Sequence, residues 1–203
     1  MFALVQDGAF VRIVNSNKGI QIDDNQYPKT IFTLWSNAER EAIGIYEVVM
    51  DTTNKKDENY YINTDVSYAY SSGTVTGSYG TATAKPLDNI LWADGDDDMP
   101  SDVSVGDIKQ YGLKPQHKQR VNDQANGLLS KYDWYVIRNQ EDSTATIPSD
   151  VSTYRTAVRT KANQMCTQID GASDVDALKT LYTYTDDGNG NITRPLAEFP
   201  EEL

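Results

Sequence analysis

The sequence predicts an α+β chain in which a β-rich N-terminal region with one short helix precedes a helical region that contains an αα-hairpin. Up to about residue 86, the apolar residues form short runs separated by Gly, Asp and Asn. After residue 114 they recur every three or four positions, which is the helical period. We therefore expect a β-rich domain at 1–86, an acidic irregular linker at 87–113 and a helical domain at 114–203.

The first residues predict a β-hairpin. Two apolar runs, Phe2 to Val5 and Phe10 to Val14, flank Asp7-Gly8, a pair that favours a tight hairpin turn. A third strand is expected near residues 20–22. The chain should then stay extended from Tyr27 to Trp35.

A short helix should follow residue 36. Ser36 and Glu39 have the spacing of a capping box, in which each side chain accepts a hydrogen bond from the other residue's backbone amide. Gly44 should end this helix, and residues 45–50 should return as a strand.

Residues 59–83 are rich in Tyr, Ser, Gly and Thr and predict a β ribbon. Val66, Tyr68 and Tyr70 alternate with small residues, which is typical of a strand with one face available for contact. Repeated glycines weaken the register of such a ribbon. We therefore expect Tyr68 and Tyr70 to lie against another surface.

The linker contains five aspartates within nine positions, from Asp94 to Asp102. A calcium-binding EF-hand loop needs glycine at its sixth position and glutamate at its twelfth, where this segment has Met99 and Val105. The default interpretation is a solvated acidic loop. The alternative is a loop held by a partner in an assembly.

Three helices are expected in the last ninety residues. The clearest has an apolar stripe at spacings of three and four, formed by Val151, Tyr154, Val158, Ala162, Met165 and Ile169. A thinner stripe predicts a helix from 114 to 131. Ser173 or Asp174 should cap a third helix, and Leu196 and Phe199 are expected to dock the tail.

The segment from Tyr132 to Arg138 has two interpretations. It is either a helix end or short strand that packs its rings on the 151–169 helix, or an interface, because Tyr, Trp and Arg dominate binding hot spots. Off the stripe, Arg155 and Arg159 are expected to face solvent. The candidate interaction residues are Tyr132, Trp134, Tyr135, Arg138, Tyr154, Arg155, Arg159, Tyr68 and Tyr70.

Composition argues against several functions. Thirty acidic and eighteen basic residues give a net charge of −12, which does not suit binding to a phosphate backbone. One histidine, His117, and one cysteine, Cys166, are too few for a zinc site or a convincing catalytic pair. We expect no enzyme activity, no metal and no cofactor. The sequence also has no membrane-spanning run and no signal peptide, so we expect cytosolic synthesis.

Several segments resemble a known group of proteins. The chain has, in order, YPKTIFTLWSNAEREAIGIYEVV, DWYVIR, IPSDVSTYRTAVRTKA, DALKTLYTY and RPLAEFP. Together they resemble bacteriophage tail-fibre-associated and tail-assembly proteins, and residues 64–112 are unmatched. Trp134 and Arg138 match the tryptophan-containing segment of that pattern, and Tyr154, Arg155 and Arg159 match the helix that follows it.

The resemblance implies a non-enzymatic structural protein of the virion, in the tail or the tail-fibre attachment region. Its expected partners are other phage structural proteins and further copies of itself in a symmetric assembly, with no role for nucleic acid or membrane. Two alternatives remain open. One is an assembly chaperone that is absent from the mature particle, and the other is a glycan-binding or glycan-processing tail module.

Overall fold

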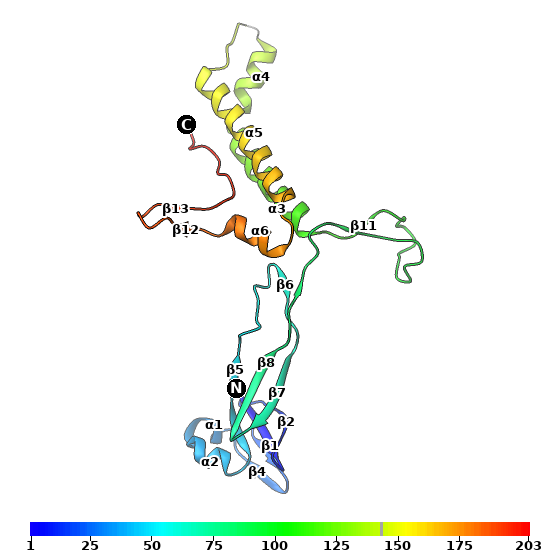
Figure 1. Ribbon diagram of the computed structural model, residues 1–203, viewed down its shortest axis with the longest axis vertical. Helices are drawn as coiled ribbons and strands as arrows, with labels where there is room; N and C mark the ends of the chain where they lie inside the picture. Colours follow the sequence, from blue (N-terminus) through cyan, green and yellow to red (C-terminus); the bar gives the residue numbers. More distant parts are fainter. Residues whose placement is uncertain (143) are drawn as a thin grey trace. The chain divides into compact units, whose positions relative to one another are not determined.

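The computed structural model describes residues 1–142 and 144–203 and divides into two compact units, Met1–Thr83 and Ala84–Leu203 (Figure 1). The first unit has most of the strands, and the second has the four longest helices. The predicted α+β class is confirmed. The acidic segment predicted as a linker at 87–113 lies within the second unit.

A five-stranded sheet organises the first unit. Its strands lie in the order β2-β1-β5-β8-β7, and β5 and β8 are parallel whereas the other neighbours are antiparallel. The strands are β1 (Phe2–Gln6), β2 (Ala9–Val14), β5 (Ile45–Asp51), β7 (Val66–Ser71) and β8 (Thr74–Tyr79). Asp7 and Gly8, with φ of 49° and 74°, make the turn between β1 and β2, so the predicted hairpin is confirmed.

Both faces of β1 are buried. Ala3 and Val5 belong to one apolar cluster with Val48 and Val75, whereas Leu4 belongs to a second cluster on the opposite face. The second cluster is completed by β3 (Ile20–Ile22), which pairs with β4 (Asn25–Tyr27), and by α1 (Ile31–Leu34). Two further short strands, β6 (Tyr61–Ile62) and β9 (Thr83–Ala84), flank the ribbon segment.

The expectation of an extended chain from Tyr27 to Trp35 was wrong. The Pro28 carbonyl accepts a hydrogen bond from the Ile31 amide at 3.2 Å, and α1 follows. A strand would send Ile31 and Phe32 to opposite faces, but the helical turn buries both in one cluster. The burial of two adjacent apolar residues therefore favours the helical turn here.

The predicted capping box is confirmed at the start of α2 (Asn37–Glu41). Ser36 Oγ accepts a hydrogen bond from the Glu39 amide at 3.3 Å, and Glu39 Oε2 accepts one from the Ser36 amide at 2.8 Å. The Glu39 carboxylate accepts hydrogen bonds from the Ser36 amide and the Ser36 hydroxyl, and these bonds lower the pKa of the Glu39 carboxyl. Gly44 follows with φ of 81°, and β5 begins at the next residue, as expected.

The second unit is built on two long helices that lie side by side (Figure 1). These are α3 (Leu113–Ser130) and α5 (Ser149–Asp170), joined through α4 (Asp133–Glu141). All six residues of the predicted α5 stripe are buried, so the periodicity correctly identified the face that packs. On α3, Val121 and Ala125 are buried opposite them.

The tail docks beside α6 (Val175–Tyr182). Asp174 Oδ1 accepts a hydrogen bond from the Ala177 amide at 2.7 Å, which confirms the predicted cap. Leu196 is 1% exposed, and its amide donates to the Leu181 carbonyl at 2.9 Å. The expected docking at Leu196 is therefore confirmed.

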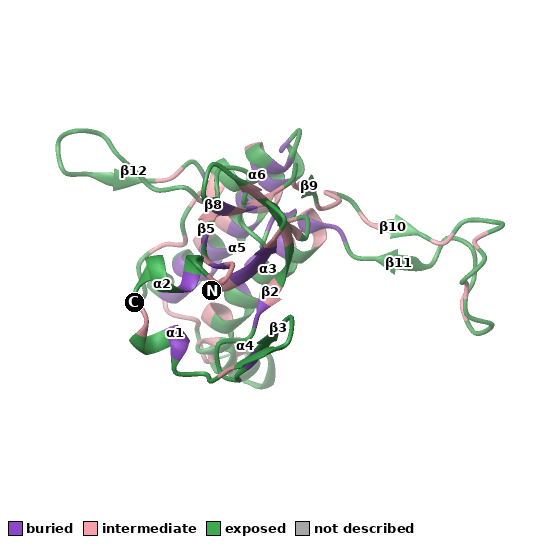
Figure 2. Ribbon diagram, turned by 90° about the horizontal axis from the view of Figure 1, so that it is seen from below, coloured by how far each residue is buried: buried purple, intermediate pink, exposed green. Residues whose placement is uncertain are grey.

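Two hairpins extend from the helices of this unit (Figures 1 and 2). One is formed by β10 (Ile90–Leu91) and β11 (Ile108–Gln110), and the other by β12 (Thr185–Asp186) and β13 (Ile192–Thr193). All the residues of these four strands are exposed.

Candidate interaction surface

An exposed surface with an aromatic side chain lies on α4. We call Trp134, Tyr135, Ile137 and Arg138 the α4 tip. None of the nine residues of α4, all of which the structure describes, is buried. Trp134 is 50% exposed and Ile137 is 56% exposed.

The side chains of the α4 tip are arranged on one side of the helix. Trp134, Ile137 and Arg138 are three and four positions apart, a spacing that places them on the same face. The Trp134 and Tyr135 ring centroids are 4.0 Å apart, and the Arg138 guanidinium lies 6.0 Å from the Trp134 ring. This exposed group has the composition of a binding hot spot.

The structure overturns the expectation that the Trp134 ring packs on the 151–169 helix. A ring that is half exposed is not a core side chain. The physical reason is that α3 and α5 already fill the space between them with Val121, Ala125 and the α5 stripe. Of the two interpretations of this segment, the helix end is confirmed but the packing of the Trp134 ring is not.

Arg155 was expected to face solvent, and this was wrong. It is 8% exposed, and its Nη1 lies 2.8 Å from Asp133 Oδ1 and 2.7 Å from the Leu129 carbonyl oxygen. Leu129 is in the last turn of α3 and Asp133 is in the first turn of α4. Arg155 therefore joins α5 to both helices and fixes the direction in which α4 leaves α3.

Tyr132, the residue before α4, packs its ring against Tyr154 of α5. Tyr154 is 4% exposed, and its ring meets the half-buried Tyr132 ring edge-on at 5.4 Å. Burial raises the pKa of the Tyr154 hydroxyl. Tyr154 is thus a core residue that cannot contact a partner, whereas Arg159 on the same helix is exposed.

Tyr68 and Tyr70 are built into the first unit. The Tyr68 ring stacks on Phe10 at 5.2 Å, and the Tyr70 hydroxyl donates to the Tyr46 hydroxyl at 3.1 Å. Both rings are half-buried against the Ala3 cluster. The ribbon predicted to lie on another surface is instead an edge of the unit's own sheet, because β8 pairs with β5.

A second exposed apolar surface was missed by the sequence-based candidates. The β10–β11 hairpin exposes five large apolar side chains, at 41% to 62%: Ile90, Leu91, Val105, Ile108 and Tyr111. In the sequence, the only signal was one short apolar run, Ile90 to Trp92, before the aspartates and isolated apolar residues after them. This is too little to give a periodic pattern.

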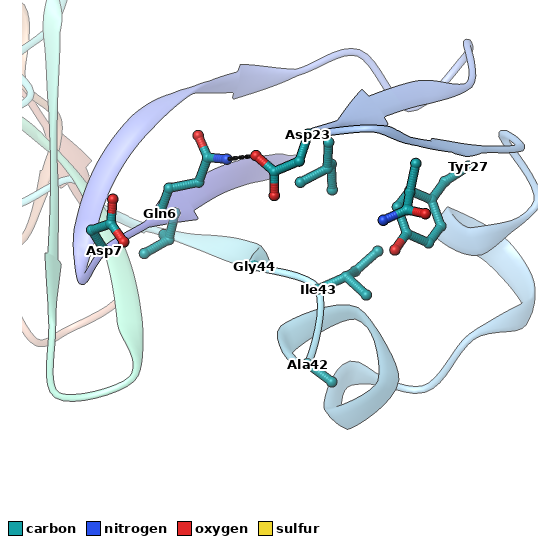
Figure 3. A pocket seen from close by; sticks show the side chains of 10 residues that line it. Gln6, Asp7, Asp23, Tyr27, Ala42, Ile43 and Gly44 are labelled. Atoms are coloured by element: carbon teal, nitrogen blue, oxygen red, sulfur yellow. Dashed lines mark hydrogen bonds between the residues drawn. The ribbon is translucent and has the colours of Figure 1, made fainter.

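A hollow of about 430 Å³ opens in the first unit beside Gly44 (Figure 3). Gln6 Nε2 donates a hydrogen bond to Asp23 Oδ1 at 3.1 Å across one side of it, and Tyr27 and Ile43 line another. Its ten described lining residues include no histidine, cysteine, serine, lysine or arginine. Its ionisable side chains are Asp7, Asp23 and Tyr27, so among these described residues no Ser, Cys or Lys nucleophile stands beside a histidine base.

The one histidine and the one cysteine of the chain are not placed for catalysis. His117 is 6% exposed, with its ring 4.7 Å from the Tyr182 ring, and burial together with the nearby Arg120 charge lowers its pKa. Cys166 lies on α5 with Sγ 3.9 Å from Asn122 Oδ1, and burial raises the pKa of its thiol. Neither group is an activated nucleophile or an accessible base.

Among residues 1–142 and 144–203, no three His, Cys, Asp or Glu side chains are grouped closely enough to hold a metal ion. In the same described part of the chain, no helix has the length and apolar character needed to cross a membrane. Comparison with protein-family models, curated proteins and solved structures gives no match to this chain.

Proposed function

We propose that this chain is a non-enzymatic structural protein of a bacteriophage virion, in the tail or tail-fibre attachment region, that acts through contacts with other proteins. The observation that supports it best is the α4 tip, where Trp134, Ile137 and Arg138 share the exposed face of a helix that buries no side chain. The phage setting is supported by the sequence resemblance of the Trp134 segment and of the helix that contains Tyr154.

The physical argument concerns the stability of α4. An isolated helix of nine residues is marginal in water, and most helical stability in proteins comes from packing of an apolar face. The apolar residues of α4 are half-buried or exposed, so the helix has contact area that a partner can cover. The Arg155 contacts hold α4 in place before that partner binds.

The partners in this proposal are other structural proteins of the particle and further copies of the chain, and the site of action is the virion after synthesis in the host cytoplasm. Non-enzymatic action is supported by the buried His117 and by the weakly nucleophilic Cys166. A tail-assembly chaperone is the second candidate, because the same exposed α4 tip would serve a transient partner.

Mass spectrometry of purified virions tests the proposal directly. We expect peptides of this chain in gradient-purified particles at a constant ratio to a known tail protein. A chain that is abundant in infected-cell lysate but missing from the particles would overturn the virion assignment in favour of the chaperone. Glycan hydrolysis by the purified chain, abolished by one carboxylate substitution, would overturn its non-enzymatic character.

A further inference from the structure

The β10–β11 hairpin and its connecting loop, residues 88–110, form an arm with little cover from the rest of the second unit. Figure 2 colours this arm as exposed or intermediate along its length, and Leu91 and Ile108, which face each other across the strands, are 49% and 41% exposed. A two-stranded hairpin alone is marginally stable in water. An arm of this kind therefore has apolar surface available to a partner.

The arm has a defined shape because its own groups are bonded to one another. Lys109 Nζ lies 3.1 Å from Asp96 Oδ2 and 4.3 Å from the Trp92 ring centroid. The same Asp96 carboxylate accepts a hydrogen bond from the Ala93 amide, and the Trp92 amide donates to the Asp107 carbonyl at 2.9 Å. Pre-formed shape reduces the entropy that binding must overcome.

The root of the arm is fixed to the start of α3. The Leu113 and Lys114 amides donate to the Pro86 and Leu87 carbonyls, each at 2.9 Å. The Gly112 amide donates to Asn89 Oδ1 at 3.0 Å. The arm thus extends from an anchored base.

The charge of the arm identifies the kind of partner it fits. Residues 88–110 contain seven aspartates and one lysine, a net charge of −6, and the whole chain has −12. The remaining 180 residues therefore also have a net charge of −6. A second copy of the chain offers no strongly basic body to receive an acidic arm, so like-charge repulsion disfavours self-association through it.

We propose that the β10–β11 arm docks on a protein of different sequence that presents an apolar groove edged by lysine and arginine. Leu91 and Ile108 enter the groove, and Asp94, Asp97 and Asp98 meet its basic edge. Asp96 is left out of that contact because it bonds Lys109 and Ala93 within the arm. The inference rests on the proposed function, since it names the partner chemistry for one of the chain's protein contacts.

Site-specific photo-crosslinking in phage-producing cells tests this. The photoreactive residue p-benzoylphenylalanine is placed at Val105 in the arm and, in a separate variant, at Ile137 in the α4 tip. We expect the Val105 probe to form an adduct with another polypeptide, and the mapped peptide of that adduct to be rich in lysine or arginine. An adduct with a second copy of this chain, or with an acidic or neutral segment, would overturn the inference.

A charge variant makes the test quantitative. In cell extract, Asp94→Asn, Asp97→Asn and Asp98→Asn together should reduce the yield of the Val105 adduct by about tenfold at an ionic strength of about 50 mM. The reduction should shrink at about 500 mM, where salt screens these charges. The matched control, Asp24→Asn, Glu47→Gln and Asp65→Asn, removes three exposed acidic charges from the first unit and should leave the yield unchanged. Equal loss in both triple variants would contradict a contact made by the arm.

The two probes separate this inference from the proposed function. An adduct at Ile137 without one at Val105 would overturn the arm contact and leave the proposed function standing. Failure of both probes to capture protein would count against both.

Discussion

Arg155 and Asp133 form an ion pair in which the guanidinium is buried and the carboxylate is half exposed, with 2.8 Å between Nη1 and Oδ1. The same Nη1 lies 2.7 Å from the Leu129 carbonyl oxygen. One side chain of α5 thereby satisfies a carbonyl at the end of α3 and a carboxylate at the start of α4. This contact determines how the α4 tip is presented.

Replacement of Arg155 should destabilise the protein, although the sequence predicted a solvent-facing position where a substitution has little effect on stability. Arg155→Ala removes two charge-assisted hydrogen bonds and should lower the free energy of unfolding by about 2 kcal/mol. Arg159→Ala, an exposed site four residues along the same helix, should change it by less than about 0.5 kcal/mol. Urea titrations of both variants measure the difference, and equal effects would contradict the structural role of the Arg155 contacts.

Trp134→Ala should affect binding more than folding. A ring that is half exposed loses about half of the buried area that a core tryptophan would lose, so we expect the free energy of unfolding to fall by about 1.5 kcal/mol. Loss of a tryptophan anchor should weaken binding to the neighbouring subunit by about 2 kcal/mol. Thermal melts and virion incorporation assays give the two quantities.

The control for Trp134→Ala is Leu34→Ala, which truncates a 78% exposed apolar side chain in the first unit. It should leave both melting temperature and incorporation unchanged. A fall in the melting temperature of Trp134→Ala without loss of incorporation would rule out the α4 tip as an interface.

The long helices were predictable from sequence because burial of one helix face imposes a period. Val158, Met165 and Ile169 lie on that stripe, and each is 2% exposed or less. The Ser36–Glu39 box and the Asp174 cap were predictable for a local reason, since each depends on residues within three positions.

What could not be predicted depends on contacts between distant segments. Arg155 is off the apolar stripe, so the helical period does not predict its burial. Its contact with Asp133 depends on where the start of α4 lies relative to α5. Trp134 is apolar enough to suggest a core residue, but the α3–α5 interface is already filled. Likewise, Tyr68 and Tyr70 lie half-buried against the Ala3 cluster because their strand, β7, pairs with β8, which pairs in parallel with the distant β5.

Two glycines near the ends of α3 should respond in opposite ways to alanine. A Cβ at Gly112 would lie 2.3 Å from the Asp88 backbone carbon, so Gly112→Ala must displace the root of the arm and should destabilise the protein by about 1–3 kcal/mol. At Gly127, an added Cβ meets no heavy atom of the described residues within 4 Å. Gly127→Ala should stabilise the helix by up to about 1 kcal/mol. Denaturant titrations measure the free energy of unfolding of both variants. Stabilisation by Gly112→Ala would mean that the root of the arm is not closely packed.

The last prediction concerns pH and the buried His117. Burial disfavours the imidazolium, so the pKa of His117 in the folded protein lies below its ordinary value of 6.5, and the nearby Arg120 charge acts in the same direction. Below pH 6.5 the unfolded chain therefore binds more protons at this site than the folded one, and stability falls as the pH is lowered. The loss is complete once the pH is below the folded pKa, and its slope cannot exceed about 1.4 kcal/mol per pH unit for one proton.

Urea titrations between pH 7.5 and pH 5.5 on the wild-type chain and on His117→Gln measure this effect. The Gln side chain does not titrate, so the variant should start less stable, because a close-packed ring beside Tyr182 is lost, but should lose less stability as the pH falls. The difference between the two pH profiles isolates the histidine from the carboxylates, which titrate mainly at lower pH. Parallel profiles would mean that His117 has the same pKa in the folded and unfolded states, in contradiction to its burial between α3 and α6.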